Sequence, residues 1–148
     1  MLKEVCKCLD EIGIQYRYIT ASEIAFPRTL KNGDVIHLHF IQNDELEILV
    51  DTQKKLPTIY DQGITGTQVI SVYSALNEFN KSTKYLKAYM LEDMQGRLVM
   101  TYDVLDTLFD TSVLSSNGLR ILIGFIENVI NEDMLKFQAL INRYVFGD

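Results

Sequence analysis

The chain has few of the residues that crosslink small proteins or bind metals. Its 148 residues include two cysteines, two histidines and no tryptophan. Cys6 and Cys8 stand two apart in a helical pattern, where their side chains would point about 200° apart, so we do not expect them to pair. The spacing predicts one buried and one exposed thiol. A reducing cytoplasm is the expected compartment.

Long apolar runs are also missing. No stretch reaches the roughly 18 residues that a membrane-spanning helix needs. The first residues run straight into amphipathic sequence, without an apolar core or a cleavage site of small residues, so we expect no secretory signal. The composition therefore predicts a protein that neither crosses nor binds a membrane.

Basic residues are too few for a nucleic-acid-binding protein. Lysine and arginine number 14 against 20 aspartates and glutamates, which gives a net charge of -6. A protein that binds nucleic acid needs a basic stripe to neutralise phosphates. Hydrophobic residues make up 47% and charged residues 23% of the chain, typical of a globular protein. We expect residues 1–148 to form one domain.

The first half of the sequence predicts a short helix followed by strands. Apolar residues repeat at helical spacing over 2–12, and Gly13 provides the residue that ends the helix. The period then changes to two. An extended lead-in is predicted at 16–20, and full strands are predicted at 23–30, 35–42 and 46–51, joined by short turns. Pro27 places the first full strand at an edge or a bulge, because proline cannot donate to a ladder.

The second half predicts a helix, a hairpin and a long closing helix. A loop over 53–66 precedes a helix that ends at 80–83, and strands over 85–92 and 97–105 flank a turn containing Gly96. Ser115 or Ser116 can cap the closing helix. The predicted fold class is α+β, in the order α-β-β-β-α-β-β-α. We expect an antiparallel sheet of about five strands with helices on one face.

These elements carry a family resemblance between Leu76 and Leu105. Leu76-Asn77-Glu78-Phe79-Asn80, then Lys84-Tyr85, then Gly96-Arg97-Leu98 before Val104-Leu105 resemble the YbjN family of small bacterial proteins, described as candidate sensory transduction regulators. That family has a fold similar to type III secretion chaperones. Leu76, Asn77 and Asn80 match its helix motif. The resemblance implies a dimerising, chaperone-like binding module without known enzymatic activity, and therefore without a cofactor. The chain lacks the Leu-Leu-x-Ala-Asn helix of acidic secretion chaperones, which argues against a secretion role.

Asn77 and Asn80 face similar directions on a helix, and asparagine is a poor helix former. The interpretation we prefer is that they tie the end of this helix to the hairpin that follows.

His37 and His39 are the one hint of a metal site. Two residues apart on a strand, they would project to the same face. A third ligand, such as Glu47 or Asp51, cannot be placed from the sequence. Two polar residues on the less buried face explain the pair more simply, so a small enzyme using His37 and His39 is an alternative only.

The sheet face away from the helices is expected to be partly apolar. Five residues form the predicted interface: Val35, Ile41, Leu49, Tyr85 and Tyr89. Such a face favours a partner. The sequence thus predicts a homodimer that binds a protein or peptide as a chaperone-like module or regulatory adaptor. An immunity-type partner protein is a further alternative.

Overall fold

The computed structural model describes residues 2–55, 66–90, 97–102 and 115–147. They form ten elements, in chain order: α1 (Leu2–Glu11), β1 (Arg17–Thr20), β2 (Glu23–Thr29), β3 (Val35–Gln42), β4 (Leu46–Lys55), α2 (Gly66–Ser82), β5 (Leu86–Met90), β6 (Arg97–Tyr102), α3 (Ser116–Ile141) and the π-helix η2 (Asn142–Phe146). The predicted turn with Gly96, most of the predicted loop 53–66 and the end of the predicted strand 97–105 lie outside the described residues.

The strands form one antiparallel sheet in the order β1-β2-β3-β4-β6-β5. The predicted α+β class is therefore confirmed. The strand number was underestimated, because the described residues form six strands instead of about five. The extra strand is β1, predicted as a lead-in: it is a true edge strand, since Tyr18 pairs with Ile24 of β2. The third predicted strand is also longer, because β4 extends to Lys55.

Helix ends follow the local signals. Gly13 adopts a φ of 77°, the left-handed conformation that glycine tolerates, just beyond α1. Ser115 is the N-cap of α3, and its side chain accepts a hydrogen bond of 3.0 Å from the backbone N–H of Gly118. The two predicted boundaries are thus confirmed, and Ser115 rather than Ser116 is the cap.

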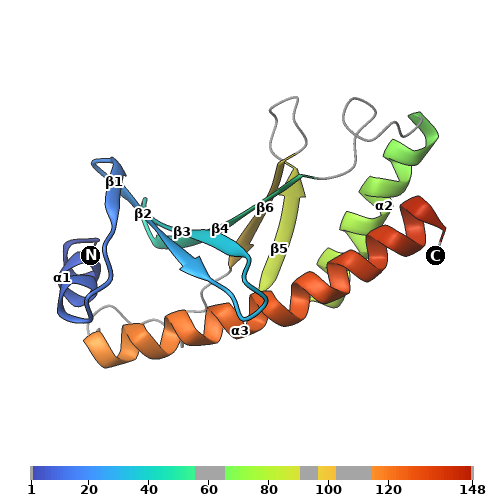
Figure 1. The fold of residues 1–148 in the computed structure, drawn as a ribbon. Helices are drawn as coiled ribbons and strands as arrows, with labels where there is room; N and C mark the ends of the chain where they lie inside the picture. Colours follow the sequence, from blue (N-terminus) through green and yellow to red (C-terminus); the bar gives the residue numbers. More distant parts are fainter. Residues whose placement is uncertain (1, 56–65, 91–96, 103–114, 148) are drawn as a thin grey trace.

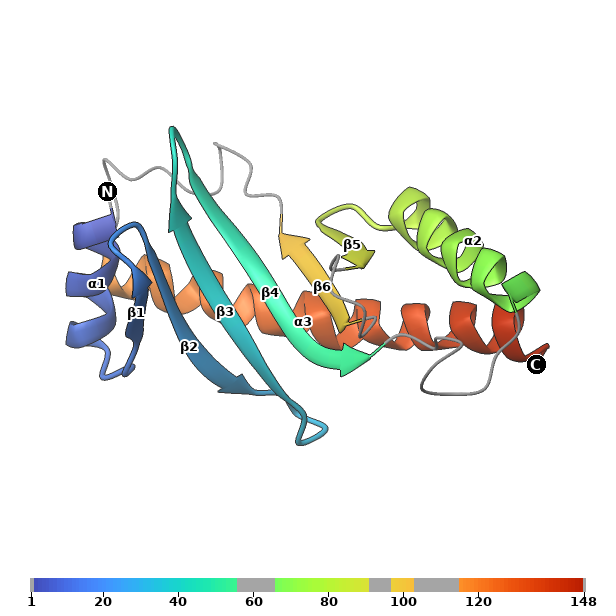
Figure 2. The same cartoon turned by 90° about the horizontal axis from the view of Figure 1, so that it is seen from above.

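The helices lie on one side and at the two ends of the sheet. Figure 1 shows α3 running beneath the strands, with α1 beside the β1 end and α2 beside the β5 end. Figure 2, seen from above, shows no described helix over the other face of the sheet. Contacts of α3 with α1, α2 and β5 explain its broad apolar band. The closing helix therefore joins both ends of the molecule.

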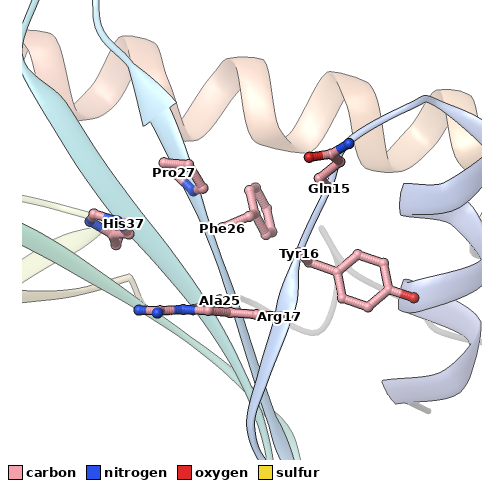
Figure 3. Close-up of a pocket in the computed structure, with 7 residues that line it drawn as sticks. All are labelled: Gln15, Tyr16, Arg17, Ala25, Phe26, Pro27 and His37. Carbon is pink, nitrogen blue, oxygen red and sulfur yellow. The ribbon is translucent and has the colours of Figure 1, made fainter.

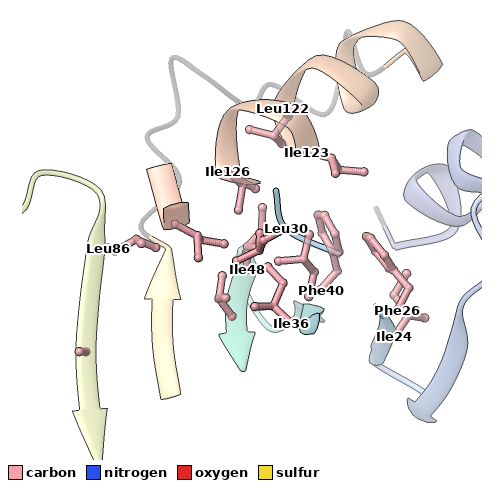
Figure 4. Close-up of a cluster of buried hydrophobic side chains, with 14 of the residues drawn as sticks. Ile24, Phe26, Leu30, Ile36, Phe40, Ile48, Leu86, Leu122, Ile123 and Ile126 are labelled. Carbon is pink, nitrogen blue, oxygen red and sulfur yellow. The ribbon is translucent and has the colours of Figure 1, made fainter. Parts of the chain in front are cut away.

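The core lies between the sheet and α3 (Figure 4). Phe26 of β2 and Phe40 of β3 stack with ring centroids 5.8 Å apart. They face apolar side chains of α3, including Ile123 and Ile126. Alternation along β3 decides this arrangement, because Ile36, Leu38 and Phe40 are all buried. Since burial of apolar area dominates folding free energy, this layer is the main source of stability.

Two sequence predictions about the helices were wrong. Cys6 and Cys8 are both buried, because α1 has neighbours on several sides: it contacts α3 and β3, and the Cys6 Sγ lies 3.3 Å from the Tyr18 hydroxyl of β1. On α2, helical spacing in the sequence groups Ile70 and Tyr73 with the apolar residues Val72, Leu76 and Phe79 and thus predicts that they are buried, but both are exposed. The buried side of α2 is turned toward α3 and η2.

Candidate binding surface

The candidate site is the sheet face that points away from α3, which we call the open face. On β3 it carries the residues between the buried ones: Val35, His37, His39 and Ile41. Cross-strand partners share a face, so Leu49 of β4 lies beside His39, and Glu47 lies beside Ile41. The sheet register therefore gathers residues of β3 and β4 on this surface.

Apolar side chains on the open face remain accessible. Val35 is 44% exposed and Tyr89 of β5 is 38% exposed. Ile41 and Leu49 are half-buried. Among the described residues no helix covers them (Figure 2). This partly apolar, concave side of the bent sheet is suited to contact another protein.

Tyr85 does not belong to this face, contrary to the sequence prediction. It precedes β5 and packs edge to face on Phe125 of α3, with ring centroids 5.4 Å apart. It is one of the partly buried side chains that pack against the core. The period-two pattern had predicted a strand from residue 85, whereas β5 begins at Leu86. Tyr85 therefore supports α3 instead of the predicted interface.

Charged groups line the open face beside its apolar residues. The His39 Nδ1 lies 2.8 Å from the Glu23 Oε2 of β2. Partial burial raises the pKa of the Tyr89 hydroxyl, and the carboxylates of Glu47 and Asp51 raise it further. The neutral phenol is thereby favoured, which keeps a donor and an apolar ring available to a partner.

The two histidines do share the open face, but the described residues do not complete a metal site. His39 is engaged with Glu23, His37 lies opposite Asp51, and Glu47 lies opposite Ile41. Within the part of the chain that the structure describes, no three His, Cys, Asp or Glu residues are grouped to hold a metal ion. None of the described residues thus supplies the third ligand that the predicted pair would need.

A small cavity opens where β1 meets β2 (Figure 3). Its volume is about 320 Å³, and its lining residues are Gln15, Tyr16, Arg17, Ala25, Phe26, Pro27 and His37. The pairing of β1 with β2 reaches only from Thr20 to Arg17, so Pro27 lies beyond the last bridge. The missing N–H of proline fits this unpaired stretch of β2. The cavity therefore occupies the space that a longer β1 would fill.

One residue of the predicted helix motif, Asn80, hydrogen-bonds to the outer edge of the sheet at β5. Asn80 of α2 donates its side-chain N–H to the carbonyl of Ala88 at 2.9 Å and accepts from the Ala88 N–H at 2.8 Å. The Thr83 hydroxyl lies 2.6 Å from the carbonyl of Leu86. Because β5 is an edge strand, these bonds satisfy backbone groups that could otherwise pair with another strand. Leu76 is buried in the core, whereas Asn77 is exposed.

Sequence reasoning did not find the cavity residues Gln15, Tyr16 and Arg17 as a site. Tyr16 and Arg17 belong to the predicted lead-in over 16–20, and Gln15 directly precedes it. The pairing partner of this segment depends on the tertiary fold. Pro27 was the available signal, because it predicted an interrupted edge at this point.

None of the described helices is both long enough and apolar enough to cross a membrane.

Comparison with known proteins places the architecture in a YbjN-like class of α+β folds. The chain superposes on the crystal structure of YbjN from E. coli, described as a candidate transcription regulator, with a TM-score of 0.55 and 13% sequence identity. The match covers 94% of this chain and 90% of that chain. No family model matches the sequence, and no curated protein matches it either. The likeness shows a shared fold.

Proposed function

We propose that this protein is a non-enzymatic binding module that acts as a homodimer through its open face. The observation that carries the proposal is the set of accessible apolar side chains on a sheet face that no described helix covers. In a two-fold dimer the same patch serves both partners. The YbjN-like fold, found in a candidate regulator, supports a regulatory or adaptor role in the binding of a protein or peptide client.

Closure of the β5 edge favours a face over strand addition. Asn80 and Thr83 occupy the outward backbone groups of Ala88 and Leu86. A partner strand would first have to displace these hydrogen bonds. Side-chain packing on the open face needs no such displacement. Both cysteines are free thiols, which fits the reducing cytoplasm that we propose as the compartment.

Sedimentation equilibrium on purified protein tests the dimer. We expect a dimer at micromolar concentration and a monomer for Leu49→Glu, because two like charges would meet across a two-fold interface. The dimer dissociation constant should rise at least about tenfold, as it does when a central interface residue is replaced. Leu135→Glu is the matched control, since Leu135 of α3 is 75% exposed and lies away from the open face. A monomeric wild type, or equal weakening by both variants, would overturn the proposal.

A further inference from the structure

The cavity between β1, β2 and β3 has a chemistry that differs from the rest of the open face. Among its lining residues are one guanidinium, one imidazole, one amide and one phenol, and no carboxylate. The protein as a whole carries a net charge of -6. A lining without acidic residues is therefore unusual for this chain, and it favours a ligand with negative charge.

Two of the lining side chains have free bonding capacity. The Nδ1 atom of His37 is buried and has no hydrogen-bond partner. A buried polar atom without a partner is uncommon in folded proteins, because it costs free energy. Arg17 takes part in none of the ion pairs of the described residues. The guanidinium of Arg17 therefore remains available for binding, whereas the buried Nδ1 of His37 is out of a ligand's reach.

The other ring nitrogen of His37, Nε2, is the candidate for contact with a ligand. Of the two ring nitrogens, only Nδ1 is both buried and without a partner. A neutral imidazole carries one proton, and a buried N–H without an acceptor is the less common arrangement in proteins. We therefore expect the proton on Nε2, where it can donate. His39 cannot replace His37 here, because its Nδ1 is bonded to Glu23.

Neighbouring acidic groups lie outside the cavity. Asp51 is the cross-strand partner of His37 on β4, which is the side of β3 away from β2 and the cavity. The Tyr16 hydroxyl donates to Asp10 of α1 at 3.4 Å. Figure 3 shows the Tyr16 ring directed toward α1, while Pro27 lies on the side of His37. The cavity thus joins a positive group to an apolar wall.

We propose that this cavity binds a carboxylate attached to a small apolar body. Arg17 would take the carboxylate through charge-assisted hydrogen bonds, and His37 would donate one more. The apolar body would lie against Ala25 and Pro27, whose cross-strand partners are His39 and His37 of the open face. A volume of about 320 Å³ is at the small end of ligand sites, which limits the ligand to one ring or a short branched chain. Such a carboxylate belongs either to a free acid or to the last residue of a peptide.

NMR titration of the full chain tests the site. The probes are benzoate for a free acid, N-acetylphenylalanine for a peptide end, and N-acetylphenylalanine amide as the neutral analogue. We expect saturable shifts at the backbone N–H of Arg17 and the ring of His37 with one or both acids, and none with the amide. The acid that binds more tightly identifies the source of the carboxylate. Absence of saturable shifts with both acids overturns the proposal, as does equal binding of the amide.

Three variants separate binding from folding. Arg17→Gln should weaken the affinity for the more tightly bound acid by about tenfold or more, which is the usual contribution of a charge-assisted hydrogen bond. His37→Phe should also weaken it, although removal of the unpartnered nitrogen leaves the thermal unfolding midpoint unchanged or higher. Arg120→Gln is the control of equal charge, because Arg120 is exposed on α3. If Arg17→Gln and Arg120→Gln bind the acid equally, the site is not at this cavity.

Discussion

Asn80 of α2 and Ala88 of β5 exchange two hydrogen bonds, of 2.9 and 2.8 Å, across the outer edge of the sheet. The side-chain amide takes the place of a neighbouring strand for this residue. The end of the same helix is held by Lys87, whose Nζ donates to the carbonyls of Asn80 and Thr83 at 2.7 and 2.6 Å. A cation at a helix C-terminus is favoured by the helix dipole. Helix and edge strand therefore form one unit.

Replacing Asn80 by alanine should destabilise the protein by about 1–3 kcal/mol, because a partly buried N–H and C=O lose their partner. Urea unfolding followed by circular dichroism measures the change. Asn77→Ala is a matched control on the same helix, since Asn77 is exposed. Its effect should stay within about 0.5 kcal/mol. Equal effects of the two variants would contradict the role of Asn80.

Asp133 of α3 predicts a pH dependence of stability. Burial raises the pKa of its carboxyl above the ordinary value, while Lys136, with its Nζ 3.8 Å from the Asp133 Oδ1, partly opposes the rise. The folded state therefore holds this proton more tightly than the unfolded chain does. Stability from this group is present in acid and lost as the pH rises through the raised pKa.

Asp133→Asn should consequently gain stability relative to wild type at pH 7, and the gain should shrink toward pH 3. Urea unfolding at both pH values measures the difference. Glu132→Gln provides the control, because Glu132 is the exposed neighbour on the same helix. A gain for Asp133→Asn that does not change with pH would show that ionisation is not its cause.

Tyr89 should ionise above the ordinary pKa of a tyrosine. Burial is the main cause, and Glu47 and Asp51 add negative charge nearby. Carbon-13 NMR of the tyrosine Cζ atoms follows the titration, and Glu47→Gln should lower the pKa of Tyr89. Glu45→Gln should leave it unchanged, since Glu45 lies in the turn before β4. No response to Glu47→Gln would place the two groups too far apart to interact.

Arg28 and Glu127 link β2 to α3 through an Nε–Oε1 contact of 2.5 Å. Both side chains are partly exposed, so the pair should contribute only about 0.2–1 kcal/mol in a double-mutant cycle with alanine. Screening should reduce this coupling in about 1 M salt. A coupling that is zero at low salt would mean that the pair holds the layers together no better than packing alone.

Local sequence patterns predicted most of the helices and strands, but not which of them pack against one another. Alternation in 35–42 assigns Ile36, Leu38 and Phe40 to one side of a strand, and all three are buried, because one sheet face is covered and the period of a strand is fixed. Ser115 was among the predicted caps, because capping depends on residues within one turn. Such signals are short in range, and tertiary packing left them intact.

Predictions failed where a distant segment decides burial. Cys8 is buried because α1 packs among α3, β3 and β1, and no pattern within 2–12 contains those contacts. Tyr85 turned to Phe125, a residue 40 positions later in the chain. The cavity residue Arg17 was missed for the same reason, since the end of β1 is defined by its pairing with β2. The candidate site is thus a property of the assembled sheet.

The position of α3 in the chain has a consequence for biosynthesis. Every strand precedes α3, yet α3 covers the buried face of the sheet. While the ribosome is still making this helix, the apolar side chains of the buried face, including Phe26 and Phe40, are exposed. Exposed hydrophobic surface of this kind makes incompletely folded chains prone to aggregate. Until α3 has been made, the buried face of the sheet therefore stays open to misassembly.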